Sequence, residues 1–219
     1  MDAQTKLAQR FIGEDDLVSV SFDNVTYSVR KALLCNASKY FVKALDGPFT
    51  ERLDRTLKLP GCDHDTFKLF LYWLCNRELP PVANAPDDDL SVETIYASFT
   101  QRTKVLIRLW CLADACLMPK LQNTSMSALM KLQEGVRVDM EVVEHTIEIA
   151  PPDSPLRKVV MDEVAYDYND GNYTDEEESQ LALMPGVLQD LLKRFRQGLN
   201  RDAPSVGREK RSSYMVAER

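Results

Sequence analysis

The stretch Leu17–Val29 reads LVSVSFDNVTYSV and decides the fold class. Up to the turn dipeptide Asp23-Asn24, apolar residues alternate with serines, and a second run rich in β-branched and aromatic residues follows. Alternation on one side of such a turn, with strand-forming residues on the other, predicts a β-hairpin. The first elements of the chain are therefore expected to be strands.

After this hairpin the hydrophobic period changes to that of a helix. Apolar residues recur at helical spacing from Val29 to Ala44, and the run Asp46-Gly47-Pro48 ends the helix. We expect Leu33 and Phe41, which lie on its apolar stripe, to be buried in the core.

One more short strand and many helices follow. The strand is predicted over Arg55–Pro60, which reads RTLKLP. Apolar spacing and helix-start residues then predict helices that begin near Asp63 or Asp65, Thr103, Pro119, Asp139 and Pro155, and a last helix over about Glu177–Gln197 that Pro185-Gly186 kinks or splits. Tyr72 and Trp73 flank the stripe of the first of these helices and should pack in the core or at its edge. This order predicts an α+β fold: short β-strands with a cluster of α-helices, followed by additional C-terminal helices.

Two segments differ in composition from the rest. Three prolines and the run Asp87-Asp88-Asp89 predict an exposed, mobile acidic loop over about 80–102. Residues 200–219 lack hydrophobic periodicity, so we expect a disordered tail there.

Bulk composition excludes several classes of protein. The formal net charge is −7, which disfavours binding to nucleic acid because the phosphate backbone is also negative. The N-terminus has no apolar run of a signal peptide, and the most apolar stretch, Val105–Met118, is too short and too charged to span a bilayer. The five cysteines form no C-x-x-C spacing, which indicates a reducing compartment. We expect an intracellular protein, cytoplasmic and/or nuclear.

The stretch Cys62–Asp65, which reads CDHD, is the one local cluster of chemically active side chains. It permits an alternative function, a small metal-binding protein or enzyme centred on Cys62 and His64. A zinc site needs three or four converging ligands, however, and aspartates at a helix start commonly act as caps. The other histidine, His145, lies on a predicted helix, and no G-x-G-x-x-G, P-loop or G-x-S-x-G pattern occurs. We therefore expect no cofactor, no metal and no enzyme activity.

Several motifs follow one another in an order that resembles the BTB/POZ family. They are SVRKALL (Ser28–Leu34), SKYF (Ser38–Phe41), GPFTE (Gly47–Glu51), LKLP (Leu57–Pro60) and FKLFLYWL (Phe67–Leu74). The later motifs LWCLADACLMPKLQN (Leu109–Asn123) and DSPLR (Asp153–Arg157) are similar to those of fungal-type BTB domain-containing proteins. The resemblance covers about Asp15–Tyr166, and it departs from the family at Arg30, where a histidine is usual.

The resemblance implies a non-catalytic protein-interaction module that acts as a scaffold or adaptor. It gives a domain map with an N-terminal segment over 1–14, a BTB/POZ-like domain over 15–134, a C-terminal helical extension over 135–199 and the tail over 200–219. Because no second recognition domain is evident in the sequence, the identity of the protein partner stays open.

Two kinds of protein partner are implied by the family. The first is a second copy of the chain, forming a homodimer. Leu7, Phe11 and Ile12 form an apolar stripe that would dock on this copy, or that would pack on its own domain. The second is a cullin, as in a substrate adaptor of a cullin-type ubiquitin ligase, contacted through Phe49 and Glu51. The alternative, which we favour, is that Phe49 packs on its own core and Glu51 is solvated.

Overall fold

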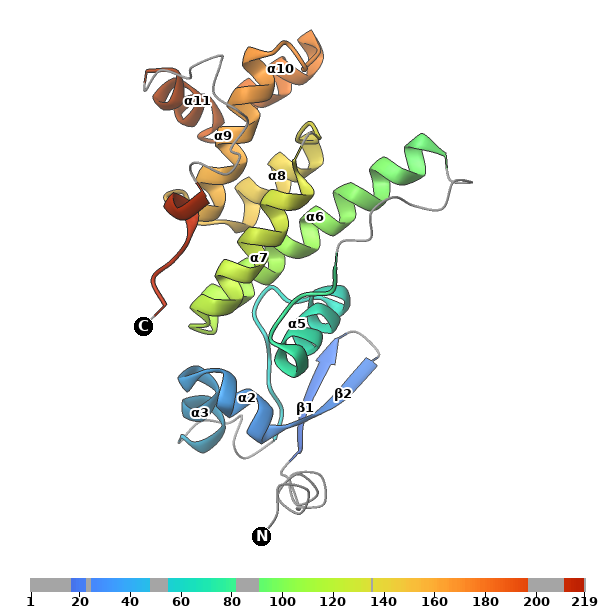
Figure 1. Cartoon of the computed structure of the whole chain (residues 1–219), viewed down its shortest axis with the longest axis vertical. Coiled ribbons are helices and arrows are strands. Elements are labelled where there is room, and N and C mark those ends of the chain that lie inside the picture. Colours follow the sequence, from blue (N-terminus) through green and yellow to red (C-terminus); the bar gives the residue numbers. More distant parts are fainter. Residues whose placement is uncertain are drawn as a thin grey trace.

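A computed structural model of the chain describes residues 17–22, 25–47, 55–81, 91–134, 136–196 and 211–218. Within these ranges it has an α+β fold, with one two-stranded sheet and a majority of helices (Figure 1). In chain order the elements are β1 (Leu17–Phe22), β2 (Val25–Arg30), α2 (Lys31–Ala37), α3 (Lys39–Asp46), α5 (His64–Asn76), α6 (Val92–Ala115), α7 (Pro119–Leu132), α8 (Met140–Ile149), α9 (Pro155–Asn169), α10 (Asp175–Leu183), α11 (Val187–Arg196) and the 3₁₀ helix η1 (Arg211–Tyr214).

The predicted hairpin is confirmed. β1 and β2 pair antiparallel with Val18 opposite Val29, and both valines are buried. The third predicted strand is reduced to a single parallel bridge beside β1, in which the Ser19 N–H donates to the Arg55 carbonyl (2.8 Å) and the Leu57 N–H donates to the Ser19 carbonyl (2.9 Å). The sheet therefore contributes one small layer at the N-terminal end of the molecule.

The helix expected after the hairpin is two helices, α2 and α3, because Ser38 breaks it. Ser38 has an extended backbone, and its hydroxyl accepts a hydrogen bond from the Tyr40 N–H and donates one to the Cys116 carbonyl (2.6 Å). A serine at this position competes with the helix by capping the next one. The bond to Cys116 also ties α3 to the end of α6.

The break changes which side chains reach the core. Phe41 is buried as expected, with 0% of its surface exposed. Leu33 is only partly buried, so that prediction was wrong, and Leu34 takes the core position instead. Helix α2 begins only after β2 ends at Arg30 and has seven residues. In so short a helix, Leu34 is the one large apolar side chain that is fully buried.

Helix α6 begins earlier than expected. Ser91 caps it by accepting a hydrogen bond from the Thr94 N–H, so residues 92–102 are helical and the prediction of a loop there was wrong. The part of the predicted loop that carries Asp87-Asp88-Asp89 lies outside the described residues. The predicted helix starts at Pro119 and Asp139 are confirmed.

The motif DSPLR has a physical role in starting α9 and fastening it. The Ser154 hydroxyl accepts a hydrogen bond from the Arg157 N–H (3.2 Å), and Pro155 occupies the first helical position. The buried Arg157 guanidinium then donates to the Asp190 carboxylate (3.0 Å) and to the Pro185 carbonyl (3.2 Å). This side chain therefore links α9 to α11 and to the turn before it.

That turn splits the last predicted helix into α10 and α11. Gly186 has φ of +79°, and a Cβ there would lie 2.8 Å from the Arg157 guanidinium. Glycine is the one residue type that fits both restrictions without strain.

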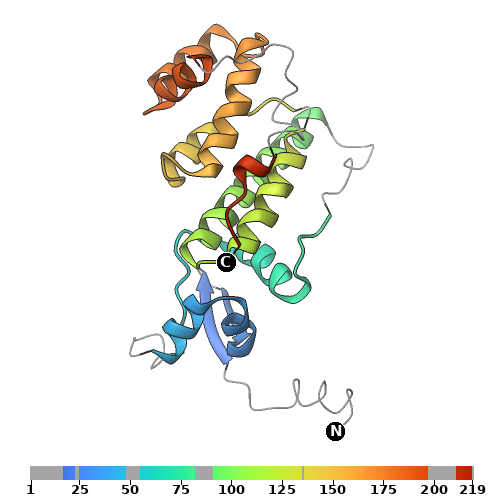
Figure 2. The same cartoon turned by 60° about the vertical axis from the view of Figure 1, so that its left-hand side comes forward.

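The C-terminal region is partly ordered, so the prediction of a disordered tail was wrong for residues 211–218. Tyr214 in η1 is buried, with 1% of its surface exposed, and its hydroxyl donates to the Asp162 carboxylate (2.6 Å). Figure 2 shows this segment, in red, lying along the helices in the middle of the molecule. A single aromatic anchor gives no periodicity, which is why the sequence pattern did not reveal it.

Two hydrophobic clusters form the core and share α6. The first joins α6 and α7 to the C-terminal helices, and the second joins the other face of α6 to the sheet, α2, α3 and α5. Within the described part of the chain, none of the helices combines the length and the apolar character needed to cross a bilayer.

Candidate protein-interaction site

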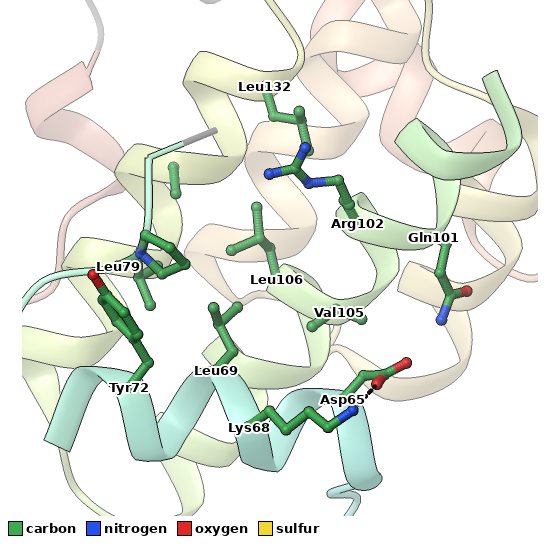
Figure 3. Close-up of a pocket in the computed structure, with 12 residues that line it drawn as sticks. Asp65, Lys68, Leu69, Tyr72, Leu79, Gln101, Arg102, Val105, Leu106 and Leu132 are labelled. Carbon is green, nitrogen blue, oxygen red and sulfur yellow. Dashed lines mark ion pairs between the residues drawn. The ribbon is translucent and has the colours of Figure 1, made fainter. Parts of the chain in front are cut away.

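A mostly apolar groove lies between α5, α6 and α7, next to the segment that leaves α5 (Figure 3). Its volume is about 340 Å³. Its lining is apolar at the centre, from residues on all three helices and from the segment after α5: Leu69, Leu79, Pro80, Val105, Leu106, Ala128 and Leu132.

Polar side chains and one aromatic ring surround this floor. Tyr72 stands at one end, with 38% of its surface exposed. At the other end of α5 Lys68 pairs with Asp65 at 3.5 Å. Arg102 of α6 lies beside Leu132 (Figure 3) and has no ion pair among the described residues. An apolar floor with a polar or charged rim occurs in protein interfaces and also in small-molecule pockets, and in both the apolar floor supplies affinity and the rim supplies specificity.

Helical spacing explains why these residues share one groove. On α5, Asp65, Leu69 and Tyr72 lie four and three residues apart, so they line one face of the helix. On α6, Gln101 and Val105 are related in the same way. The neighbouring Trp73 does not line the groove and is buried in the core, so the two adjacent aromatic residues divide between the groove and the core.

The stretch Cys62–Asp65, considered above as a metal or catalytic centre, is used by the fold itself. Asp63 caps α5 by accepting a hydrogen bond from the Thr66 N–H (2.9 Å), and it also pairs with Arg108 of α6. His64 is hydrogen-bonded through Nε2 to the Tyr27 hydroxyl. Within the ranges that the structure describes, no three His, Cys, Asp or Glu side chains gather so that they could hold a metal ion.

The pKa values of these groups follow from their surroundings. Burial, together with the charge of Asp63, raises the pKa of the Cys62 thiol to about 12. Burial also acts to raise the pKa of Asp63, but the hydrogen bonds from Thr66 and the pairing with Arg108 outweigh it and lower the pKa. Cys62 is therefore a protonated thiol of low reactivity at neutral pH, and Asp63 is a structural carboxylate.

His145 lies on α8 near two cations. Burial, and then the positive charges of Arg108 and Lys104, lower its pKa, so its imidazole is neutral at physiological pH. The carboxylates of Glu148 and Asp63 act in the opposite direction, but burial and the two cations outweigh them.

The residues expected to contact partners are not among those that the structure describes. Phe49 and Glu51 are outside the described residues, as are Leu7, Phe11 and Ile12. The groove itself was not predicted, because it is built by three helices whose mutual placement no local pattern specifies. Its one signal was Tyr72, an aromatic residue beside an apolar stripe.

Comparison with known proteins gives this groove no assignment. No protein-family model matches the chain, and no curated protein matches it.

Proposed function

We propose that the chain is a non-catalytic protein-interaction module, a BTB/POZ-like scaffold or adaptor that binds a partner protein in the groove between α5, α6 and α7. The observation that carries this proposal is the apolar floor of the groove, framed by Tyr72 and the charged rim. The order of a hairpin, short helices and a long helix pair supports the BTB/POZ-like part of it.

The size of the groove suits one or two anchoring side chains. Its volume of about 340 Å³ is that of a small-molecule pocket, for which the range is roughly 300–1,000 Å³, so it has room for a few side-chain-sized groups. Burying a leucine- or phenylalanine-sized side chain contributes about 1.5–3 kcal/mol. The partner is therefore expected to insert an apolar side chain beside Tyr72 and to place an acidic group near Arg102.

The test compares three forms of the full chain as bait in extracts of the native cell: wild type, Tyr72→Ala and Tyr96→Ala. Tyr96 is the matched control, because it is an exposed tyrosine on α6 that does not line the groove. A partner captured by wild type and by Tyr96→Ala is then purified, and its Kd for each form is measured.

We expect Tyr72→Ala to weaken this binding by about tenfold or more, since anchoring aromatic residues contribute over 1 kcal/mol. Equal affinity for all three forms would show that the partner binds elsewhere and would refute the groove as the site.

The cullin-adaptor function concerns different residues and has its own test. Binding of the host's cullin to wild type is compared with binding to a Phe49→Ala, Glu51→Ala variant whose folding has been checked. Loss of binding in the variant would support the cullin-adaptor function, and absence of binding by wild type would refute it.

A dilution series followed by light scattering tests the homodimer, since a monomer at every concentration excludes it.

A further inference from the structure

The C-terminal segment, residues 211–218, packs against helices far from it in the sequence. Residues 197–210 separate it from α11, yet it runs from α9 toward the start of α7 (Figures 1 and 2). Tyr214 is buried, and Met215 and Val216 are partly buried against the cluster formed by α6, α7 and the C-terminal helices. Three features show what kind of segment this surface accepts.

The first feature is a tyrosine pocket on α9. The Tyr214 hydroxyl donates to Asp162 at 2.6 Å, and the Lys158 ammonium lies 5.5 Å from the centre of the ring. Asp162 is in turn fixed by an ion pair with Arg194 of α11. The pocket thus contacts both the ring and the hydroxyl of the tyrosine.

The second feature is a backbone clamp on α7. The Asn123 carboxamide oxygen accepts from the Val216 N–H (2.8 Å), and its nitrogen donates to the Val216 carbonyl (2.9 Å). One side chain thereby satisfies both polar groups of a single extended residue, as a neighbouring β-strand would. Contacts of this kind depend on the backbone, so they accept any extended segment whose side chains fit.

The third feature is a cationic hollow beyond the clamp. Glu218, which also accepts from Asn123 at 2.9 Å, lines a hollow of about 1270 Å³ together with Lys39, Arg77 and Lys120. These three cations have no ion pair among the described residues, and Glu218 is the one acidic residue in the described lining. In a chain of net charge −7, this hollow favours an acidic group.

We propose that the surface of α7 and α9 is a second binding site, which takes an extended segment of the pattern Tyr-x-Val-x-Glu from a partner protein. The chain's own Tyr214–Glu218 occupies this site and blocks it. The proposal is independent of the groove between α5, α6 and α7, so either one can fail without the other.

The tether makes the block effective. A short tether gives an effective concentration on the order of millimolar, against which a partner segment must compete. The site therefore opens to partners only when the internal segment is weakened.

The experiment uses the full chain and a fluorescein-labelled peptide of sequence RSSYMVAER, which corresponds to residues 211–219. Binding is followed by fluorescence polarisation. We expect Tyr214→Ala, whose internal segment lacks its anchor, to bind the peptide at least tenfold more tightly than wild type. Adding Asn123→Ala to this variant should abolish the gain, and a peptide of scrambled sequence should not bind.

A folded Tyr214→Ala variant that does not bind the peptide would overturn the proposal, as would equal binding of the peptide by wild type and by this variant.

A second measurement, hydrogen exchange of the wild type, covers the case in which the variant does not fold. We expect the Val216 amide to exchange at least tenfold faster than that of Leu129 in the core of α7. Equal protection would mean that the segment leaves only when the whole protein unfolds, and the site would not be a binding site. Wild-type oligomers that dissociate when the peptide is added would assign the occupant to a second copy and overturn the part of the proposal that concerns a partner protein.

Discussion

Replacing Arg157 by methionine tests how the C-terminal helices are held to the rest of the fold. The guanidinium is almost fully buried, with 7% of the side chain exposed, and the Asp190 carboxylate that it meets at 3.0 Å is 14% exposed. Methionine keeps most of the side-chain volume and removes the charge and the two hydrogen bonds. Asp190 and the Pro185 carbonyl then lose their donor.

Removing one partner of a buried ion pair costs about 3–5 kcal/mol, because the other charge is left without compensation. Lys193 lies 3.7 Å from the other oxygen of Asp190 and compensates part of the charge, so we expect a loss of about 3 kcal/mol, at the low end of this range. In a chain of this size each kcal/mol lowers the melting temperature by about 2–4 °C, which gives a drop of roughly 6–12 °C.

The assay is urea denaturation of four forms: wild type, Arg157→Met, Asp190→Leu and the double variant. If the ion pair is the cause, the double variant should be more stable than the sum of the two single losses predicts, by about 1–3 kcal/mol. A loss below 1 kcal/mol in Arg157→Met, or strict additivity in the double variant, would refute the reasoning.

The further predictions concern four side chains. Asp63→Ala should lose about 1 kcal/mol of stability in urea denaturation because α5 loses its cap, whereas Asp63→Asn should lose less, and equal losses would contradict the capping role. Because the folded-state pKa of Asp63 is lowered, its charge contributes stability above the unfolded pKa of 3.8, and the stability difference between wild type and Asp63→Asn should shrink as the pH falls through the lowered value. Burial raises the pKa of Asp167, so its ionisation opposes folding as the pH rises through the raised pKa, and at pH 7 Asp167→Asn should be at least as stable as wild type. Asp167→Ala should lose about 1–3 kcal/mol, because the Val138 N–H loses its acceptor. Equal thermal midpoints of the two variants would argue against this. Phe41→Ala should lose about 3–5 kcal/mol, and an unchanged melting temperature would mean that Phe41 is not a core residue. A thiol reagent at pH 8 should modify the exposed Cys75 first, which mass spectrometry of the digested protein would show or disprove.

Local sequence signals predicted the elements that local chemistry defines. The hairpin followed from alternation around a turn. The start of α5 was predicted at Asp63 or Asp65, and the structure has Asp63 as the cap, while the starts of α7 and α8 followed from Pro119 and Asp139. Phe41 was predicted correctly from a helical stripe, whereas Leu33 of the same stripe was not, because the helix breaks at Ser38.

Signals that depend on distant partners were missed. The break at Ser38 is stabilised by the carbonyl of Cys116, the residue that follows α6, and Tyr214 is ordered by a carboxylate in α9. The candidate groove is a still stronger case, since each helix supplies an ordinary amphipathic face and the hollow exists only where three of them meet. Asn123 likewise has no signal in the sequence that would predict its hydrogen bonds to the C-terminal segment.

The position of α6 between the two hydrophobic clusters has a consequence for cooperativity. Ile107 and Trp110 belong to one cluster and Leu109 and Leu112 to the other, so neither cluster can melt without disturbing the helix that the other needs. Thermal unfolding should therefore follow one transition, and calorimetry should show a single heat-capacity peak. A ligand that binds only the native state raises the stability of the whole cooperative unit. The melting temperature of the full chain therefore serves as a screen for ligands at either proposed site.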